Sequence, residues 1–157
     1  MKDTGIKVVA TNRQARHRYT LLDTYECGLV LTGSEVKSLR EAKVQLTEAW
    51  GSIDAGEAWL HGMHVAPYSH AQDHSGHHPT RDRKLLLHRN QIDRIRMKMQ
   101  LERLTLVPTR LYFSNGKVKV EIALGKGKTT VDKRHDLAKR QSDREAARAI
   151  ADARRRE

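Results

Sequence analysis

Cysteine, proline and aromatic residues are scarce in this 157-residue chain, which has one cysteine, three prolines and 4% aromatics. With Cys27 as its single cysteine, the chain cannot form an intramolecular disulfide. Hydrophobic residues still make up 38% of the sequence, so a modest core is expected, built mainly from aliphatic side chains. The sequence therefore predicts one small domain, stabilised by aliphatic packing, plus a tail.

Long apolar runs are also missing. The longest ones, such as 85–87, are far shorter than the roughly 20 residues that a membrane-spanning helix needs. The first residues, Met1–Gly5, lead into no apolar signal region. These absences predict a cytoplasmic protein that has no membrane partner.

Positive charge, in contrast, is in excess. The formal net charge is +11 and the isoelectric point is near 10.1. A surplus of this size attracts polyanions. A membrane surface is the weaker candidate, since we find no amphipathic helix with a broad apolar face beside a basic one. Composition thus favours nucleic acid as the partner, while a merely soluble basic protein stays open at this point.

Strand signals dominate from about residue 12 to residue 124. The clearest marks a hairpin over 111–124, where apolar and polar residues alternate around Asn115-Gly116. This dipeptide favours the tight turn that joins two antiparallel strands. Pro108 cannot donate a hydrogen bond to a neighbouring strand, which predicts a bulge or an edge position there.

Two more strand features are expected nearer the N-terminus. The segment 54–57 predicts the turn of a second hairpin, which joins a strand ending near Ile53 to one over 58–63. A long strand is expected over 17–31, with Gly28 as a bulge or bend.

Two short helices are expected between these strands. Thr32 and Glu35 have the spacing of a capping box, which predicts a helix that runs to about Arg40. Asn90 is expected to cap a second helix, in which Ile92, Ile95 and Met99 share one stripe. Five or more short strands with small helices between them predict a mainly β fold, an OB-like antiparallel β-barrel. The barrel is expected over 12–125, after a flexible leader over 1–11.

The basic tail over 126–157 differs from the barrel in composition. It follows a glycine–lysine hinge at 125–128, and beyond Asp132 its only bulky aliphatic residues are Leu137 and Ile150. Because isolated helices of this length are marginal in water, we expect a tail that is disordered alone and helical when bound. As a helix it carries one basic stripe, formed by Lys133, Arg140, Arg144, Arg148 and Arg155.

Enzyme chemistry finds little support. The histidines around 70–78 invite a metal reading, but glycine and proline at 76 and 79 oppose a helix that would bring them together, and no cysteine pair supports a zinc site. Ser75 lacks the strand-to-helix elbow of a hydrolase nucleophile. The segment 125–128 is too short to be a phosphate-binding glycine loop. We therefore predict no catalytic residue, metal or cofactor.

Two basic clusters are the better candidates for function. The segment 12–17 holds arginines that can pair with phosphates or stack on bases, although it can equally be a solvated leader. The segment 81–84 is similar, but its charges can also simply guard the hydrophobic residues after it against aggregation. Glu26 is of interest only if it faces RNA, where a carboxylate can accept from guanine or from a 2′-hydroxyl.

Eight motifs carry a family resemblance, and they lie in order from about residue 8 to residue 140. Each motif is weak alone, but eight in order are specific. They are Asn12-Arg13-x-Ala15-Arg16-His17, Thr24-Tyr25-Glu26-x-Gly28, Gly33-x-Glu35-Val36-Lys37-Ser38-Leu39-Arg40, Arg83-Lys84-Leu85-Leu86-Leu87, Leu111-Tyr112-Phe113, Lys117-Val118-Lys119-Val120, Lys126-Gly127-Lys128 and Asp132-Lys133-Arg134. The chain resembles the tmRNA-binding protein family, also known as SsrA-binding protein or small protein B.

The resemblance implies a non-enzymatic protein with an OB-like barrel that binds the tRNA-like domain of tmRNA. Such proteins accompany tmRNA, together with elongation factor Tu, to ribosomes stalled on messages that lack a stop codon. The barrel takes the place of the missing anticodon arm, and the tail enters the empty mRNA channel of the small subunit and acts at the decoding centre. A general OB-fold RNA chaperone or ribosome-associated RNA-binding protein is the alternative.

The resemblance also implies site residues. Four positions match residues implicated in tmRNA binding: Asn12, Glu26, Leu86 and Lys119. Leu86 is expected either to pack against a base or to brace the barrel. We add basic residues near the matched positions and in the hinge, which are Arg13, Arg16, His17, Lys84, Lys126 and Lys128. The decoding-centre tail is assigned Asp132, Lys133 and Arg134 from its motif and Arg140, Arg144 and Arg148 from its stripe.

One position departs from the family pattern. The family often has a histidine or an aromatic residue before the tail motif, suited to stacking on a base, whereas this chain has Val131. Base–aromatic stacking contributes about 1–3 kcal/mol, and valine can supply only part of that by apolar contact. Val131 is therefore left out of the predicted site.

Overall fold

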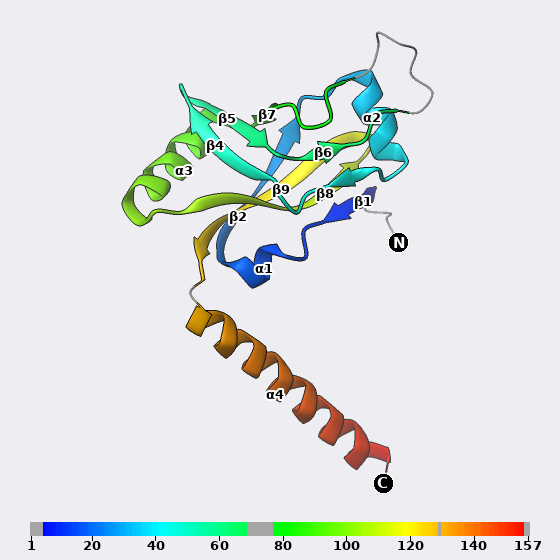
Figure 1. Cartoon of the computed structure of the whole chain (residues 1–157), viewed down its shortest axis with the longest axis vertical. Helices are drawn as coiled ribbons and strands as arrows, with labels where there is room; N and C mark the ends of the chain where they lie inside the picture. Colours follow the sequence, from blue (N-terminus) through cyan, green and yellow to red (C-terminus); the bar gives the residue numbers. More distant parts are fainter. Residues whose placement is uncertain (1–4, 69–76, 129, 156–157) are drawn as a thin grey trace. The chain divides into compact units, whose positions relative to one another are not determined.

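The computed structural model describes residues 5–68, 77–128 and 130–155. The chain divides into two compact units, Met1–Gly127 and Lys128–Glu157. The first unit holds all the strands and three helices, and the second holds one helix (Figure 1). Each unit is described by itself below.

Antiparallel strands form a closed ring in the first unit (Figure 1). Strand β8 pairs with both β9 and β4, so the order β8–β4–β5–β7–β2–β9 returns to its starting strand. Strand β1 also pairs with β8 but is not part of the closed ring. A two-stranded sheet of β3 and β6 lies beside the ring. The prediction of a mainly β fold is confirmed.

The strands have the following bounds: β1 (Ile6–Thr11), β2 (Tyr19–Leu29), β3 (Val44–Gln45), β4 (Trp50–Asp54), β5 (Glu57–His61), β6 (His64–Val65), β7 (Arg83–Leu86), β8 (Thr105–Ser114) and β9 (Lys117–Gly127).

Both predicted hairpins are present. Strands β8 and β9 meet at Asn115 and Gly116, whose φ angles of 51° and 79° are the left-handed values that a tight hairpin turn requires. Strands β4 and β5 meet at Ala55 and Gly56, which also have positive φ angles. The β8–β9 register shifts just after Pro108, which confirms the predicted bulge.

The sequence reading was wrong at three places near the N-terminus. Residues 6–11 of the expected flexible leader form β1, because β-branched residues there pair with β8 and Val9 packs against the core. The expected strand over 17–31 begins only at Tyr19, because a short helix, α1 (Ala15–Arg18), precedes it. Its irregular register lies between Leu21 and Thr24 instead of at Gly28, which pairs regularly on both sides.

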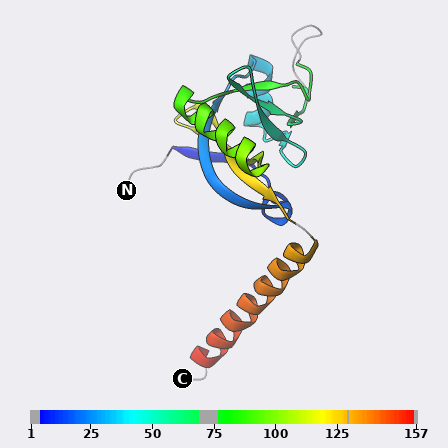
Figure 2. The ribbon, with the colours of Figure 1, turned by 90° about the vertical axis from the view of Figure 1, so that its left-hand side faces the viewer.

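The two helices that the sequence predicted in the first unit, called the ring unit below, are present with one shift. Helix α2 (Gly33–Arg40) starts with the expected capping box, in which Thr32 and Glu35 bond each other's backbone N–H groups. Helix α3 (Arg89–Glu102) is capped by His88 and not by Asn90, because the Gln91 side chain accepts from the His88 backbone N–H at 3.2 Å. Its Ile92 and Ile95 are buried, as the stripe predicted, and Figure 2 shows the helix against the ring.

The core inside the ring is aliphatic, as the scarcity of aromatic residues predicted. Its fully enclosed side chains come from strands all around the ring, among them Leu60, Leu85, Leu106, Leu111, Val120, Ile122 and Leu124. Cys27 is also fully enclosed, and this burial raises the pKa of its thiol to about 12. The thiol therefore stays protonated and serves as a small apolar side chain.

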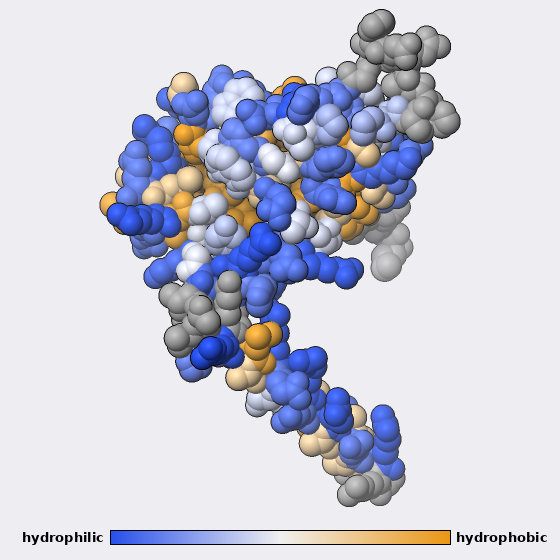
Figure 3. All heavy atoms as spheres, in the orientation of Figure 1, coloured by the Kyte–Doolittle hydropathy of each residue, from blue (hydrophilic) through white to orange (hydrophobic). Residues whose placement is uncertain are grey.

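The second unit is the helix α4 (Thr130–Arg155). Nearly all of its described side chains are exposed, so the helix has no core of its own. The expectation that the tail is disordered alone stays a prediction. No helix within the described ranges is both long and apolar enough to span a membrane, and hydrophilic residues cover most of the surface in view (Figure 3).

Candidate nucleic-acid interface

Three neighbouring strands bring predicted RNA-binding residues into one row on the outside of the ring. Gly28 on β2 pairs with Leu86 on β7 at one side and with Lys119 on β9 at the other. Directly paired residues point to the same face of a sheet. Leu86, Gly28 and Lys119 therefore form a row, in which adjacent strands are about 4.8 Å apart.

Strand periodicity adds two more predicted residues to this face. Lys84 is two positions before Leu86 on β7, and Glu26 is two positions before Gly28 on β2. The residues between them, Leu85 and Cys27, point into the core and are buried. Four predicted contacts from three strands thus share the outer face.

These four residues line one cleft of about 670 Å³. Another part of its wall comes from the β4–β5 turn and the start of α3, through Gly56, Glu57, His88, Arg89 and Gln91. Sequence analysis missed this wall, since no motif links the turn to the helix. Arg89 extends over the turn, where its guanidinium nitrogen lies 3.0 Å from the position that a Cβ of Gly56 would take. Arg89 therefore adds a cation to the rim of the cleft.

Leu86 is an unusual residue for an outer face. Its side chain is 51% exposed and lies directly over Gly28, where an added Cβ would sit 3.2 Å from the Cβ of Leu86. A glycine at this position therefore permits the leucine to lean across β2. Of the two roles expected for Leu86, contact with a partner fits this exposure better than bracing the core.

The cleft combines groups that suit RNA. Lys84 and Lys119 can pair with phosphates, and the ion pair of Lys84 with Glu57 at 3.2 Å is too exposed to hold the lysine tightly. Leu86 offers an apolar surface to a base. Glu26 can accept hydrogen bonds from guanine or a 2′-hydroxyl but not from phosphate, so it favours selectivity over general affinity.

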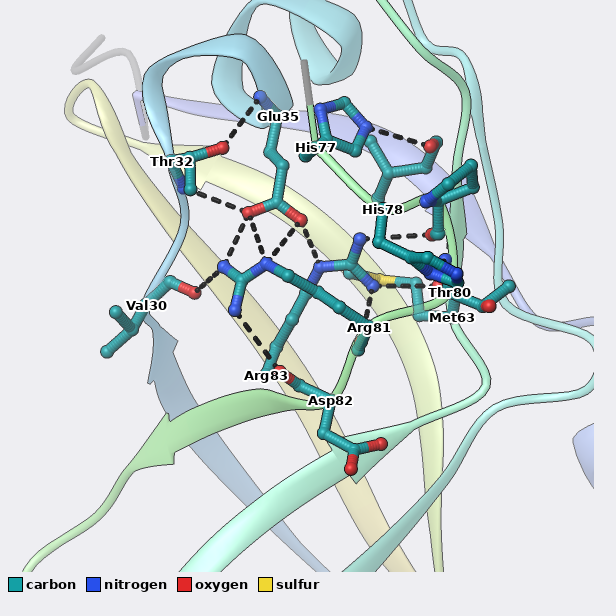
Figure 4. A network of polar contacts seen from close by, with 12 residues as sticks. Val30, Thr32, Glu35, Met63, His77, His78, Thr80, Arg81, Asp82 and Arg83 are labelled. Carbon is teal, nitrogen blue, oxygen red and sulfur yellow. Dashed lines mark hydrogen bonds and ion pairs between the residues drawn. The ribbon is translucent and has the colours of Figure 1, made fainter. Parts of the chain in front are cut away.

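A second network fixes the strand that displays Lys84 and Leu86 (Figure 4). The carboxylate of Glu35 lies between Arg81 and Arg83, with contacts of 2.5 Å to each guanidinium. Arg83 also donates to the backbone oxygens of Met63 at 2.8 Å and Pro79 at 3.1 Å. This cluster joins α2 to the start of β7.

The Glu35 cluster corrects the prediction for the segment 81–84, whose charges were expected either to contact RNA or to guard the hydrophobic residues after it. Glu35 and Arg83 are both 0% exposed, so Arg83 neither guards a strand nor reaches RNA. Burial alone would raise the pKa of Glu35, but hydrogen bonds from Arg81, the Thr32 backbone and Arg83 lower it below its usual value. The carboxylate is therefore ionised and the cluster is a structural ion pair.

The N-terminal predicted contacts form a separate group. Arg13 and Arg16 are exposed and His17 is half-buried, all in or just before α1. Thr20, near the start of β2, pairs with Lys126, so this lysine lies near the same end of the strand. The cleft lies toward the other end of β2, an 11-residue strand with an extended length of about 35 Å. The structure thus divides the predicted residues of the ring unit between two places.

Asn12 differs from its neighbours because it is only 6% exposed. Its amide nitrogen donates to the backbone oxygen of Pro108 at 2.9 Å, which ties the end of β1 to β8. Its Oδ1 is buried without a hydrogen-bond partner among the described residues. The side chain is therefore too enclosed to contact RNA directly in this structure, and it holds the segment that carries Arg13 and Arg16.

The remaining predicted residues lie in the second unit. Lys128 is half-buried, and Arg134, Arg140, Arg144 and Arg148 are exposed on α4. The side chains of Asp132 and Lys133 lie outside the described part of the structure, as does most of the histidine segment 70–78. His77 is described and bonds Ser34 and the Val65 backbone oxygen, each at 2.9 Å. No group of three metal-ligating residues occurs within the described ranges.

A closed ring of strands that presents lysines, a carboxylate and an exposed leucine in one cleft has the features of a nucleic-acid-binding β protein. Comparison with known proteins identifies the family. The model of the SmpB protein family matches residues 9–152, and the chain belongs to this family.

Individual relatives agree with this assignment. The SsrA-binding protein of Nocardia farcinica is 54% identical over 150 residues, covering 96% of this chain and 93% of the relative. That of Mycolicibacterium smegmatis is 56% identical over 144 residues, covering 92% of this chain and 89% of the relative. A solved chain from the structure "tmRNA-SmpB: a journey to the center of the bacterial ribosome" matches with a TM-score of 0.65 and 40% identity, over 82% of this chain and 93% of that chain.

Proposed function

We propose that this protein binds the tRNA-like domain of tmRNA and delivers it to stalled ribosomes for trans-translation. The observation that carries the proposal is the cleft, in which Glu26, Lys84, Leu86 and Lys119 line one surface. The names of its relatives and of the solved structure refer to SsrA, tmRNA and the ribosome, which supports the same partner. The protein acts as a non-enzymatic binder in the cytoplasm.

The two groups of cations then have different tasks. The cleft recognises the folded RNA, while Arg13, Arg16 and Lys126 pair with phosphates near the other end of β2. The closed ring, with α3 between β7 and β8 along the chain, supports the predicted OB-like barrel. Elongation factor Tu takes part through the tmRNA complex.

The tail supplies the second half of the mechanism. Helix α4 has 26 residues, which corresponds to a length of about 39 Å. Its described arginines at 140, 144 and 148 recur every four residues, so they share one side of the helix. Such a helix suits an RNA-lined channel, and we infer that it probes the empty mRNA channel and the decoding centre of the small subunit.

Substitution of Glu26 tests the proposed recognition. Glu26→Ala should weaken binding to the tRNA-like domain of tmRNA by about tenfold, which corresponds to the loss of one hydrogen bond to a charged group. Binding to an ordinary tRNA should change little, because phosphate contacts dominate that interaction. The measurement is a pair of dissociation constants at fixed salt, and equal losses for both RNAs would contradict a role of Glu26 in selectivity.

The alternative, a general RNA chaperone, predicts a different result in the same assay. General single-strand binders stack bases on aromatic platforms. Among the described aromatic residues, Trp50 has the exposed side chain, with 48% of it exposed. It packs on His61, with the ring centroids 4.3 Å apart. Unstructured RNA should therefore compete poorly with tmRNA. Efficient competition would favour the chaperone.

A further inference from the structure

Tyr112 lies next to the cleft and is enclosed although it points outward. It pairs with Lys119 across β8 and β9, whereas its neighbours Leu111 and Phe113 point into the core. Only 2% of Tyr112 is exposed, and the guanidinium of Arg110 lies 4.8 Å from the centre of its ring. The aromatic ring of Tyr112 is therefore held in place on the outer face of the sheet, beside the predicted RNA contact Lys119.

The hydroxyl of Tyr112 donates a hydrogen bond to the carboxylate of Glu26. Within the described part of the chain, Tyr112 is the one side chain that donates to this carboxylate. Glu26 stands directly opposite Glu121 in the β2–β9 register, and like charges in this arrangement repel. Glu121 has partners of its own, because Thr109 donates to its carboxylate at 2.5 Å and the Arg110 guanidinium lies 3.6 Å away.

Because Glu121 is engaged by Thr109 and Arg110, the Tyr112 hydroxyl is available to orient the Glu26 side chain. An exposed glutamate samples several rotamers, and ordering it on binding lowers affinity. The hydrogen bond from the Tyr112 hydroxyl to Oε2 selects one orientation of the carboxylate in advance, in which Oε1 can accept from RNA. Burial raises the pKa of Tyr112, and the Glu26 carboxylate raises it further, so the phenol keeps its proton and acts as a donor.

We propose that Tyr112 is a positioning residue that orients the Glu26 carboxylate for RNA recognition. The inference rests on the proposed function, since it assigns to Tyr112 a role that is exerted only through Glu26. The residues are 86 positions apart in the sequence, and no motif connects them.

The test is a double-mutant cycle on the full-length protein. Dissociation constants for the tRNA-like domain of tmRNA are measured for the wild type, Tyr112→Phe, Glu26→Ala and the double variant. Tyr112→Phe keeps the ring and removes one hydroxyl, so affinity should fall by about fivefold. In the Glu26→Ala background the same substitution should have no further effect, which a merely structural role of Tyr112 would not produce.

Tyr25→Phe is the matched control. Tyr25 precedes Glu26 on β2, packs against the core and interacts with Lys98, so it lies on the opposite face of the strand. This control should leave affinity unchanged. If Glu26→Ala itself has no effect, the proposed function fails; if Glu26→Ala weakens binding but Tyr112→Phe does not, only the inference about Tyr112 fails. A Tyr112→Phe loss that persists without Glu26 overturns it as well.

A second measurement leaves Tyr112 unchanged and observes its hydroxyl directly. NMR of the wild type with labelled tyrosine rings reports on the acceptor of each hydroxyl. Glu26→Ala, which removes the acceptor, should shift the Tyr112 signal and leave the Tyr25 signal in place. An unchanged Tyr112 signal would mean that the hydrogen bond is absent in solution and would overturn the proposal.

Discussion

The ring unit and helix α4 carry the same kinds of charge but constrain them differently. In the ring, Glu35 and Arg83 are fully enclosed and Glu26 is held by Tyr112. On α4 the described charges are exposed, and their contacts are short-range, such as Arg144 with Gln141 at 3.2 Å. The ring can therefore recognise a particular RNA shape, whereas α4 offers charge density along a rod.

The largest expected effect is the loss of stability of the ring unit when one buried charge is removed. Arg83→Ala leaves the Glu35 carboxylate buried with a single remaining ion-pair partner, Arg81. Breaking a buried pair in this way costs about 3–5 kcal/mol, measured as the free energy of unfolding in denaturant.

Lys84→Ala is the matched control for Arg83→Ala, because Lys84 is the next residue on β7 but points outward and is half exposed. It should change the free energy of unfolding by less than about 1 kcal/mol. Equal effects of the two substitutions would show that the Glu35 cluster does not stabilise the ring.

Acid should weaken the same cluster. The pKa of Glu35 is lowered in the folded protein by its hydrogen bonds, so its contribution is complete above the unfolded value of about 4.3 and is lost as pH falls through the folded value. The wild type should be much more stable than Glu35→Gln at pH 7, and the difference should narrow below about pH 4.3. Chemical unfolding of both proteins along a pH series measures this, and a constant difference would mean that Glu35 does not titrate as proposed.

The sequence predicted those parts of the fold whose signals are local. The Asn115-Gly116 turn, the Thr32–Glu35 capping box and the bulge at Pro108 each depend on neighbouring residues, and all three are present. The buried role of Arg83 could not be predicted, because its carboxylate partner lies 48 positions away on another element.

The candidate site also combines residues that local motifs predicted with residues that only the folded structure brings together. Family motifs predicted Glu26, Leu86 and Lys119, and strand register brings all three to one cleft. Arg89 and Tyr112 were missed, because only the folded chain brings Arg89 to the cleft and Tyr112 to Glu26. Motifs thus identified residues that face the cleft, while the residues that hold them in place needed the three-dimensional structure.

Removal of the tail should have the smallest effect on stability and the clearest effect on function. Truncation after Lys128 keeps the pairing of Lys126 and Gly127 with β2 and should change the free energy of unfolding by less than about 0.5 kcal/mol. The truncated protein should still bind tmRNA but should no longer support peptide tagging on stalled ribosomes. Denaturant unfolding, RNA binding and a reconstituted tagging reaction check the three outcomes. Because the described α4 side chains bury so little, a large loss of stability would mean that the tail packs on the ring in solution, and persistent tagging would show that the ring unit alone suffices.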